Sequence, residues 1–447
     1  MACVDELSRR NPHGQGARGE EGGMVEGSLT FQAGFWWGTA TSSHQVEGGN
    51  INDWTRWEER PGAIWGGQRS GAACDQYHRY REDFAQLGEL GFNAHRFSVE
   101  WSRVEPDEGV FSREALDHYR RVVDACRESG MEPFLTLHHF TNPLWVADRG
   151  GWLNPQVVDW FARYTEEVVR ALGERVTWWM TVNEPLVFAT MGHLAGIWPP
   201  GHHSLAETVT VVRHMLIAHA RAYRAIKERF PAAQVGVAHN LRPFHPSRPE
   251  SWSDRKLAAF LDRTFNRLFV EAIETGMLGW PGWGWFTPRG RSIPGLGGSE
   301  DFLGVNYYGR GLVRFGLDLA RAAAQPPPPG AEVNQLGWEV YPEGLLEVLR
   351  WLGRYGKPII ITENGICTDD DDQRVRFIRS HLEVVARSLG EGIPVRGYFY
   401  WSSHDNFEWA EGYRARFGLI GVDFDTQERT VRPSARFLGE VARRGAL

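Results

Sequence analysis

The sequence predicts an α/β fold, a single (β/α)8 TIM barrel with elaborated βα loops. Short apolar runs alternate along the chain with longer amphipathic stretches, and this alternation is typical of parallel strands joined by helices. The length of 447 residues fits one barrel with long loops, and no linker divides the chain. In addition, Glu184 and Glu363 each close an apolar run, at the rim where such barrels place their active sites.

The eight candidate strands lie at residues 34–40, 92–99, 132–137, 176–183, 235–238, 302–307, 359–363 and 395–401. Helix-like segments separate several of them. In residues 112–128, for example, apolar side chains recur at helical spacing, and Gly130 supplies a stop. Pro326–Pro329 predict a stiff surface loop. This loop could be a connection without a functional role, or it could line the substrate-binding site. Counted in this order, Glu184 ends the fourth strand and Glu363 ends the seventh.

Two carboxylates at the ends of buried strands indicate chemistry more than packing. An unpaired charge in a protein core is costly and shifts the pKa of the group. A salt bridge at the strand end is the alternative for either glutamate taken alone. Because Glu184 and Glu363 both follow buried strands of one predicted barrel, we expect them to form an active site.

The composition is ordinary for a globular enzyme and excludes several classes of protein. The chain is 42% hydrophobic and 23% charged, so it can bury a large core, and most of it is not disordered. With a net charge of −7, the chain lacks the excess positive charge that is typical of proteins that bind nucleic acid or an anionic membrane. The favoured partners are neutral or weakly charged small molecules.

The cysteines and the first residues predict a cytoplasmic protein. The chain has four cysteines, Cys3, Cys74, Cys126 and Cys367. Their wide spacing favours reduced thiols. Residues 1–28 are polar and rich in glycine, and they lack the apolar core of a signal peptide. We therefore predict a disordered N-terminal extension at 1–28, followed by the catalytic domain at 29–447.

A series of motifs occurs in order along the chain. They read FWWGTATSSHQVEG at 35–48, HRFS at 95–98, TLHH at 136–139, TVNEP at 181–185, DFLGVNYY at 301–308, TENG at 362–365 and NFEWAEGY at 406–413. With these motifs the chain resembles glycoside hydrolase family 1, the retaining β-glucosidase family, from residue 31 to residue 437. The resemblance implies a (β/α)8 barrel whose fourth and seventh strands hold the acid/base and the nucleophile.

The resemblance implies unequal roles for the two glutamates. Glu363 would be the nucleophile that attacks the anomeric carbon, and Glu184 would be first the acid and then the base, with the carboxyl groups about 5 Å apart. Arg96 and Tyr308 would lie beside Glu363 and keep it ionised. Asn183 would bind the sugar 2-hydroxyl. The alternatives are an ordinary ion pair of the barrel for Arg96 and a turn-capping amide for Asn183.

The resemblance also implies a substrate-binding set around the catalytic residues. It consists of Gln45, His139, Asn306, Trp338, Trp401, Glu408, Trp409 and Phe417. Trp401 matches the platform beneath the sugar, and Trp338 matches a stacking residue for the leaving group, although a lone tryptophan also fits loop packing. For His139 the alternative is a core histidine with a satisfied hydrogen bond. Glu408 favours sugars without a 6-phosphate, because a carboxylate would repel phosphate.

These residues imply a retaining, exo-acting β-glycosidase, chiefly a β-glucosidase that hydrolyses terminal non-phosphorylated β-D-glucosyl residues. β-D-Galactosides and β-D-fucosides are also possible substrates. The chain could also form a homo-oligomer. The expected partners are small-molecule β-glycosides or short oligosaccharides. Neither a cofactor nor a metal is expected, because no spacing of His, Cys and carboxylates is typical of a zinc cluster. The alternatives are a transglycosylase of the same family and a sugar-binding barrel without catalysis.

Overall fold

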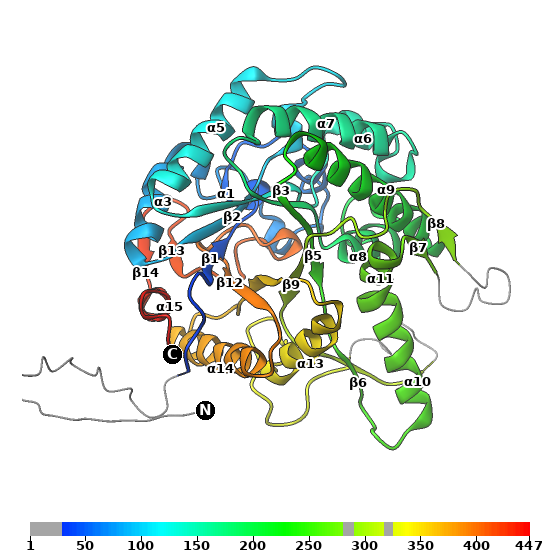
Figure 1. The fold of residues 1–447 in the computed structure, drawn as a ribbon, viewed down its shortest axis with the longest axis vertical. Helices are drawn as coiled ribbons and strands as arrows, with labels where there is room; N and C mark the ends of the chain where they lie inside the picture. The colour runs from blue at the N-terminus through cyan, green and yellow to red at the C-terminus, as the bar shows by residue number, and fades with distance from the viewer. Residues whose placement is uncertain (1–28, 280–289, 317–324) are drawn as a thin grey trace, which may run out of the picture.

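A closed barrel of eight parallel strands forms the centre of the molecule (Figure 1). The computed structural model describes residues 29–279, 290–316 and 325–447, so the predicted N-terminal extension at 1–28 lies outside the described residues. In order around the barrel, the strands are β1 (Trp36–Ala40), β2 (Ala94–Ser98), β3 (Glu132–His138), β4 (Trp178–Asn183), β5 (Gln234–Asn240), β9 (Phe302–Tyr307), β11 (Ile359–Asn364) and β12 (Val395–Trp401). Each strand overlaps one of the predicted apolar runs, which confirms the predicted fold class.

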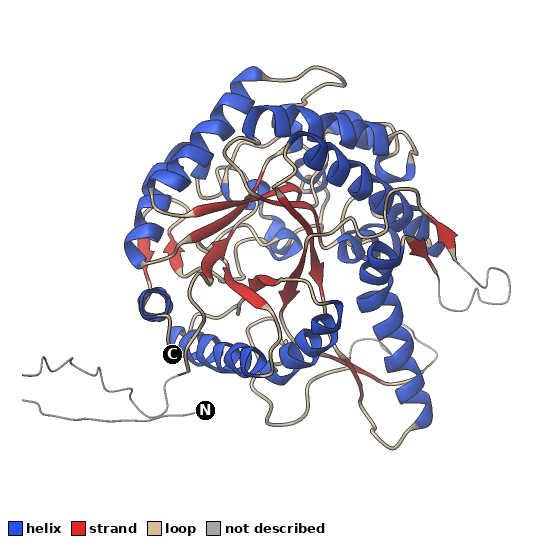
Figure 2. Cartoon of the chain, in the orientation of Figure 1, coloured by secondary structure: helices blue, strands red, loops and turns tan. Residues whose placement is uncertain are grey.

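Helices surround the barrel on its outer side, as Figure 2 shows. The longer ones are α3 (Gln76–Leu90), α5 (Arg113–Glu128), α7 (Val157–Leu172), α9 (Leu205–Arg229), α10 (Trp252–Leu261), α11 (Leu268–Thr275), α13 (Pro342–Leu352), α14 (Asp371–Gly390) and α15 (Pro433–Arg444). Helix α5 confirms the helix predicted at residues 112–128, and the Ser112 hydroxyl caps it by accepting from the Ala115 backbone N–H. Within the described ranges, none of the helices combines the length and the apolar character needed to cross a membrane.

Shorter elements lie in the connections. The short helices are α1 (Ser43–Val46), α2 (Asp53–Trp57), α4 (Trp101–Val104), α6 (Leu144–Asp148) and α8 (Pro185–Ala189), and the single helical turns are η1 (Trp65–Gly67), η2 (Gly151–Leu153), η3 (Thr190–Leu194), η4 (Asp262–Arg267), η5 (Gly353–Tyr355) and η6 (Trp409–Glu411). Short strand pairs are β6 (Phe244–Pro246) with β10 (Gly311–Val313), β7 (Met277–Leu278) with β8 (Arg291–Ser292), and β13 (Ile420–Val422) with β14 (Arg429–Val431). The sequence does not predict these pairs, because two or three residues are too few to show an alternation. Pro326–Pro329 lie in a mostly exposed loop, as predicted.

The interior of the barrel has an apolar layer below a polar layer. The apolar layer consists of Ala94, Phe134, Met180, Phe302, Ile360 and Phe399, with Trp36 and Trp178 packed against it. The ring of Phe134 stacks on Trp178 at 5.0 Å and meets Phe399 edge-on at 4.7 Å. Two residues further along their strands, Arg96, Thr136 and Thr362 point to the same side and are buried. The strands therefore place polar side chains directly above a close-packed floor.

We expect Phe134→Ala to destabilise the protein by about 3–5 kcal/mol, because a large-to-small change in a packed core leaves a cavity in addition to the lost burial. Ile360→Val in the same layer is the matched mild change and should cost only about 0.5–1.5 kcal/mol. Chemical unfolding followed by tryptophan fluorescence would measure both. Equal losses for the two variants would contradict the packing described for this layer.

Candidate active site

Glu184 and Glu363 occupy irregular positions at the ends of two barrel strands. The pairing of β4 with β5 shifts register between Met180 and Asn183, and the pairing of β11 with β9 shifts between Ile361 and Glu363. Such irregularities redirect side chains, often next to active sites. Glu184 follows β4 with a φ of 44°, a left-handed conformation that is uncommon for a residue with a side chain. The backbone is thus irregular at the two positions that hold the carboxyl groups.

The carboxylate of Glu363 lies between a cation and a phenol. Nη1 of Arg96 donates to Oε1 at 2.6 Å, and the hydroxyl of Tyr308 donates to Oε2 at 2.6 Å. Burial raises the pKa of Glu363 above its ordinary value, whereas the charge of Arg96 and the hydrogen bond from Tyr308 act in the opposite direction. Both partners stabilise the ionised form of this carboxyl group.

Arg96 also connects the two glutamates through amide side chains. Its Nη2 donates to Oδ1 of Asn183 at 2.6 Å, and its Nε donates to Oγ1 of Thr136 at 3.1 Å. Nδ2 of Asn306 donates to the same oxygen of Asn183 at 3.1 Å and to Oε1 of Glu184 at 2.7 Å. A continuous chain of hydrogen bonds therefore runs from Arg96 to Glu184.

Glu184 accepts hydrogen bonds from neutral amide groups, whereas Glu363 contacts a cation. Its Oε1 accepts from Nδ2 of Asn240 at 2.9 Å and from Asn306, and the residue is 7% exposed. Burial, followed by the negative charge of Glu363, raises the pKa of Glu184 to about 7. Near neutral pH, Glu184 can therefore hold a proton beside Glu363, whose ionised form is stabilised by Arg96 and Tyr308. Two carboxyl groups with separated pKa values can act as a proton donor and as a nucleophile.

Gln45 and Glu408 form one edge of the site. Nε2 of Gln45 donates to Oε2 of Glu408 at 3.2 Å, and Nε1 of Trp401 lies 3.4 Å from the same oxygen. Burial raises the pKa of Glu408 to about 8, so this carboxyl group is largely protonated at neutral pH. In that state it can both donate and accept hydrogen bonds toward the hydroxyl groups of a ligand.

His139 lies between this edge and the two glutamates. Its Nε2 is 3.1 Å from Nδ2 of Asn183, which assigns the proton of the neutral ring to Nδ1. Burial keeps the pKa of His139 well below its ordinary value, so the ring is neutral. Across the described ranges, Nδ1 of His139 has no hydrogen-bond partner. The ring also stacks on Trp401 at 5.8 Å. An N–H group buried without a partner is well suited to a ligand oxygen.

Aromatic rings line the remaining sides. Trp409 lies nearly parallel to His139, with ring centroids 6.0 Å apart. Trp338 contacts Tyr308 at 6.1 Å and Phe417 at 6.4 Å, and it is 38% exposed, which places it at the rim. Phe417 itself is buried. All of the predicted catalytic and substrate-binding residues thus lie in one connected set.

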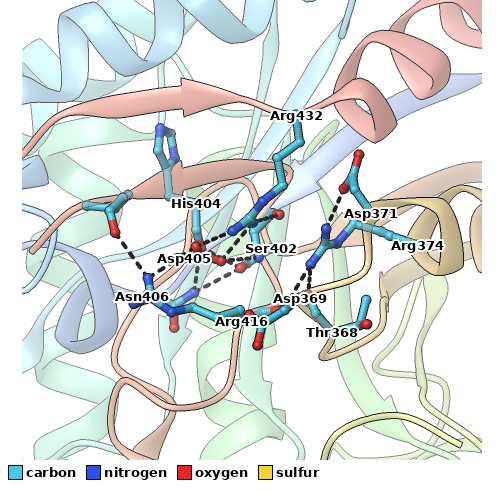
Figure 3. A network of polar contacts seen from close by, with 12 residues as sticks. Thr368, Asp369, Asp371, Arg374, Ser402, His404, Asp405, Asn406, Arg416 and Arg432 are labelled. Carbon is cyan, nitrogen blue, oxygen red and sulfur yellow. Dashed lines mark hydrogen bonds and ion pairs between the residues drawn. The ribbon is translucent and has the colours of Figure 1, made fainter.

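A buried polar network fixes the segment 402–408 behind this edge (Figure 3). Asp405 accepts from Nη1 of Arg432 at 2.9 Å and from Nη2 at 2.7 Å. The neighbouring Asn406 accepts from Nε2 of Gln45 at 3.0 Å. Because Asp405 is buried and paired with a cation, the segment is anchored below the site, and Gln45 is oriented through it.

Asn240 and Asn406 contact predicted site residues but are not predicted from the sequence. Asn240 is the last residue of β5, so the strand-end rule that identifies the glutamates could also have found it. Asn406 opens the motif at 406–413, and its contact with Gln45 shows that it belongs to the same edge as Glu408.

The chain is similar to known glycosidases over most of its length. Residues 28–446 match the family model for glycosyl hydrolase family 1. The chain is 34% identical over 443 residues to beta-glucosidase A of Thermotoga maritima, covering 93% of this chain and 98% of that one. Among solved structures, a family 1 β-glucosidase from Thermotoga maritima superimposes with a TM-score of 0.89 at 33% identity and covers 94% of this chain and 100% of that one. A β-glycosidase from Pyrococcus horikoshii has a TM-score of 0.86 at 40% identity, covering 94% and 96%. In sequence and in fold, the chain belongs to glycosyl hydrolase family 1.

Proposed function

We propose that the protein is a retaining β-glucosidase that removes terminal, non-phosphorylated β-D-glucosyl residues from small glycosides or short oligosaccharides. The observation that supports this most directly is the unequal environment of its two strand-end glutamates. Glu363 contacts Arg96 and Tyr308, whereas Glu184 contacts the amides of Asn240 and Asn306. Glucose as the sugar is supported by relatives such as beta-glucosidase A of Thermotoga maritima.

The proposed reaction is a double displacement. In the first step Glu363 attacks the anomeric carbon, the bond from that carbon to the leaving oxygen breaks, and Glu184 gives its proton to this oxygen. The glucosyl group is then bonded covalently to Glu363. In the second step water attacks the same carbon, gives a proton to Glu184 and releases Glu363. Two inversions return the sugar with its β configuration, and Arg96 stabilises the carboxylate each time it is ionised.

The edge formed by Gln45 and Glu408 suits the free hydroxyl groups of a sugar. Gln45 already donates to Glu408, and both can exchange hydrogen bonds with a ligand. Glu408 supplies no positive counter-charge to a 6-phosphate, and in its ionised form it would also repel the phosphate. A phosphorylated sugar would lose its hydration without gaining an ionic partner here.

A cytoplasmic location is part of the proposal. Cys74, Cys126 and Cys367 are free and buried, which suits a reducing compartment, whereas Cys3 lies outside the described residues. Cell fractionation followed by immunodetection should recover the protein with the cytosol. Recovery from the culture medium would contradict this location.

Glu184→Ala should reduce kcat/KM for alkyl β-glucosides by about 10²–10⁴-fold, because these leaving groups need a proton from a general acid. For 2,4-dinitrophenyl β-glucoside, whose leaving group is stable as an anion, the reduction of kcat/KM should be far smaller. Glu363→Ala is the control and should abolish turnover of both substrates. Equal losses on the two substrates in Glu184→Ala would count against the acid role.

The pH dependence of kcat/KM should show a decline above about pH 7. Glu184 loses its proton there, since its pKa is about 7, and an ionised Glu184 cannot protonate the leaving oxygen. In Glu184→Gln the decline above pH 7 should disappear from the residual rate, while the decline at acid pH, which reports Glu363, should remain. Steady-state rates with 4-nitrophenyl β-glucoside from pH 4 to 9 provide the measurement. If the decline above pH 7 persists in Glu184→Gln, that decline must come from the titration of another group.

Glu408→Ser should lower kcat/KM for 4-nitrophenyl β-glucoside by about 10–100-fold through the loss of hydrogen bonds to the sugar. The ratio of activity on the 6-phosphorylated glucoside to activity on the free glucoside should rise at the same time. Trp338→Ala serves as a matched control, because Trp338 lies at the rim and should leave this ratio unchanged. A wild-type protein that prefers the 6-phosphate would refute the proposed specificity.

A further inference from the structure

His193, His202 and Glu207 meet in the connection that follows Glu184 along the chain. His193 lies in η3, His202 lies between η3 and α9, and Glu207 lies in the first turn of α9. One ring nitrogen from each histidine and one carboxylate oxygen of Glu207 all lie within 4.8 Å of one another. Imidazole nitrogens and a carboxylate oxygen are ligands that suit a divalent transition metal.

His193 has an unused polar atom that faces this group. The residue is 2% exposed, and its Nδ1 is buried without a hydrogen-bond partner in the described parts of the chain. Oε2 of Glu207 is 3.9 Å from Nδ1 of His193, which is beyond hydrogen-bonding distance. A buried polar atom without a partner is costly and is often explained by a missing water or ion.

The position of Glu207 also suits metal binding. Its Oε2 lies 2.7 Å from Nδ1 of His202, so the carboxylate and one histidine are already in contact. Neutral imidazoles and a carboxylate are the forms that bind a metal.

The backbone holds the three side chains in a defined arrangement. The N–H of His202 donates to the carbonyl of Gly192 at 2.9 Å, and the N–H of Ser204 donates to the carbonyl of His193 at 2.7 Å. Ser204 also caps α9 by accepting from the N–H of Glu207 at 3.3 Å. The turn that contains His193 and the helix that contains Glu207 are thus tied together before any ligand binds.

We propose that His193, His202 and Glu207 bind one Zn²⁺ ion through Nδ1, Nδ1 and a carboxylate oxygen. Tetrahedral zinc with bonds near 2.0–2.2 Å separates its ligand atoms by roughly 3.4 Å. The observed separations of 2.7 Å and 3.9 Å lie on either side of this value. The side chains of His202 and Glu207 are 42% and 37% exposed, so both can adjust while His193 stays in place.

A cavity of about 300 Å³ gives the proposed ion a path of entry and room for a fourth ligand. His193 and His202 line it together with residues of α2 and α6. Zinc held by three protein side chains commonly keeps a water at its fourth position. We expect that position to face this cavity.

The proposed ion would stiffen a loop that supports the sugar site. Trp198 lies between His193 and His202 in the sequence, and its ring packs on Phe140 at 4.9 Å and on Trp409 at 5.9 Å. An ion that ties the two ends of this stretch would hold Trp198 against Trp409. The proposed site is thus structural and stands independently of the hydrolytic mechanism.

Zinc binding by the tag-free full-length protein tests the site. After treatment with a chelator and removal of the chelator, Zn²⁺ is titrated in competition with a chromophoric chelator. We expect one ion per chain, with affinity reduced at least about tenfold in His202→Ala and in Glu207→Gln. His203→Ala is the matched control, because His203 is an exposed neighbour outside the ligand set, and it should bind zinc like the wild type.

Two further measurements use the same variants. Zn²⁺ should raise the melting temperature of the wild type and of His203→Ala but not that of His202→Ala. Co²⁺ should give the visible absorption of a four-coordinate site in the wild type, and Glu207→Gln should lose it. His202→Ala and Glu207→Gln change partly exposed side chains, and the folding of both can be checked by far-UV circular dichroism. The site is refuted if the wild type binds no zinc, or if these variants bind it as tightly as the wild type.

Discussion

The buried contact between Arg96 and Glu363 is the interaction on which the rest of the site depends. Arg96 is fully buried, and its guanidinium group also orients Asn183 and Thr136. Removing one partner of a buried ion pair typically costs about 3–5 kcal/mol, because the other charge is left without compensation. A single cation therefore stabilises the charge of Glu363 and holds the amide that leads to Glu184.

The difference between the two glutamates follows from what surrounds each of them. Both are buried, and burial alone would raise the pKa of both. Arg96 and Tyr308 oppose that effect at Glu363, whereas Glu184 has amide donors and the nearby negative charge of Glu363. The same fold can thus separate the pKa values of two buried carboxyl groups.

The rim of the barrel consists of loops that are fixed by separate sets of contacts. The segment 402–408 is anchored through Asp405 and Arg432, and it places Glu408 beside Gln45. The loop after Glu184 is tied by backbone hydrogen bonds, and we propose that zinc ties it further. Trp198, from the loop after Glu184, packs on Trp409, which directly follows the segment 402–408, so the two loops support each other.

The sequence by itself determined the barrel strands, one long helix and the rim position of both glutamates, and the ordered motifs implied the residues around them. Apolar runs, helical spacing and strand ends are local features that can be seen in a single sequence. The sequence did not determine the short strand pairs, the contact of Asn240 with Glu184, the burial that raises the pKa of Glu408, or the grouping of His193 with His202 and Glu207. Only the tertiary structure decided these, because burial, desolvation and distances between residues far apart in the chain exist only in the folded protein.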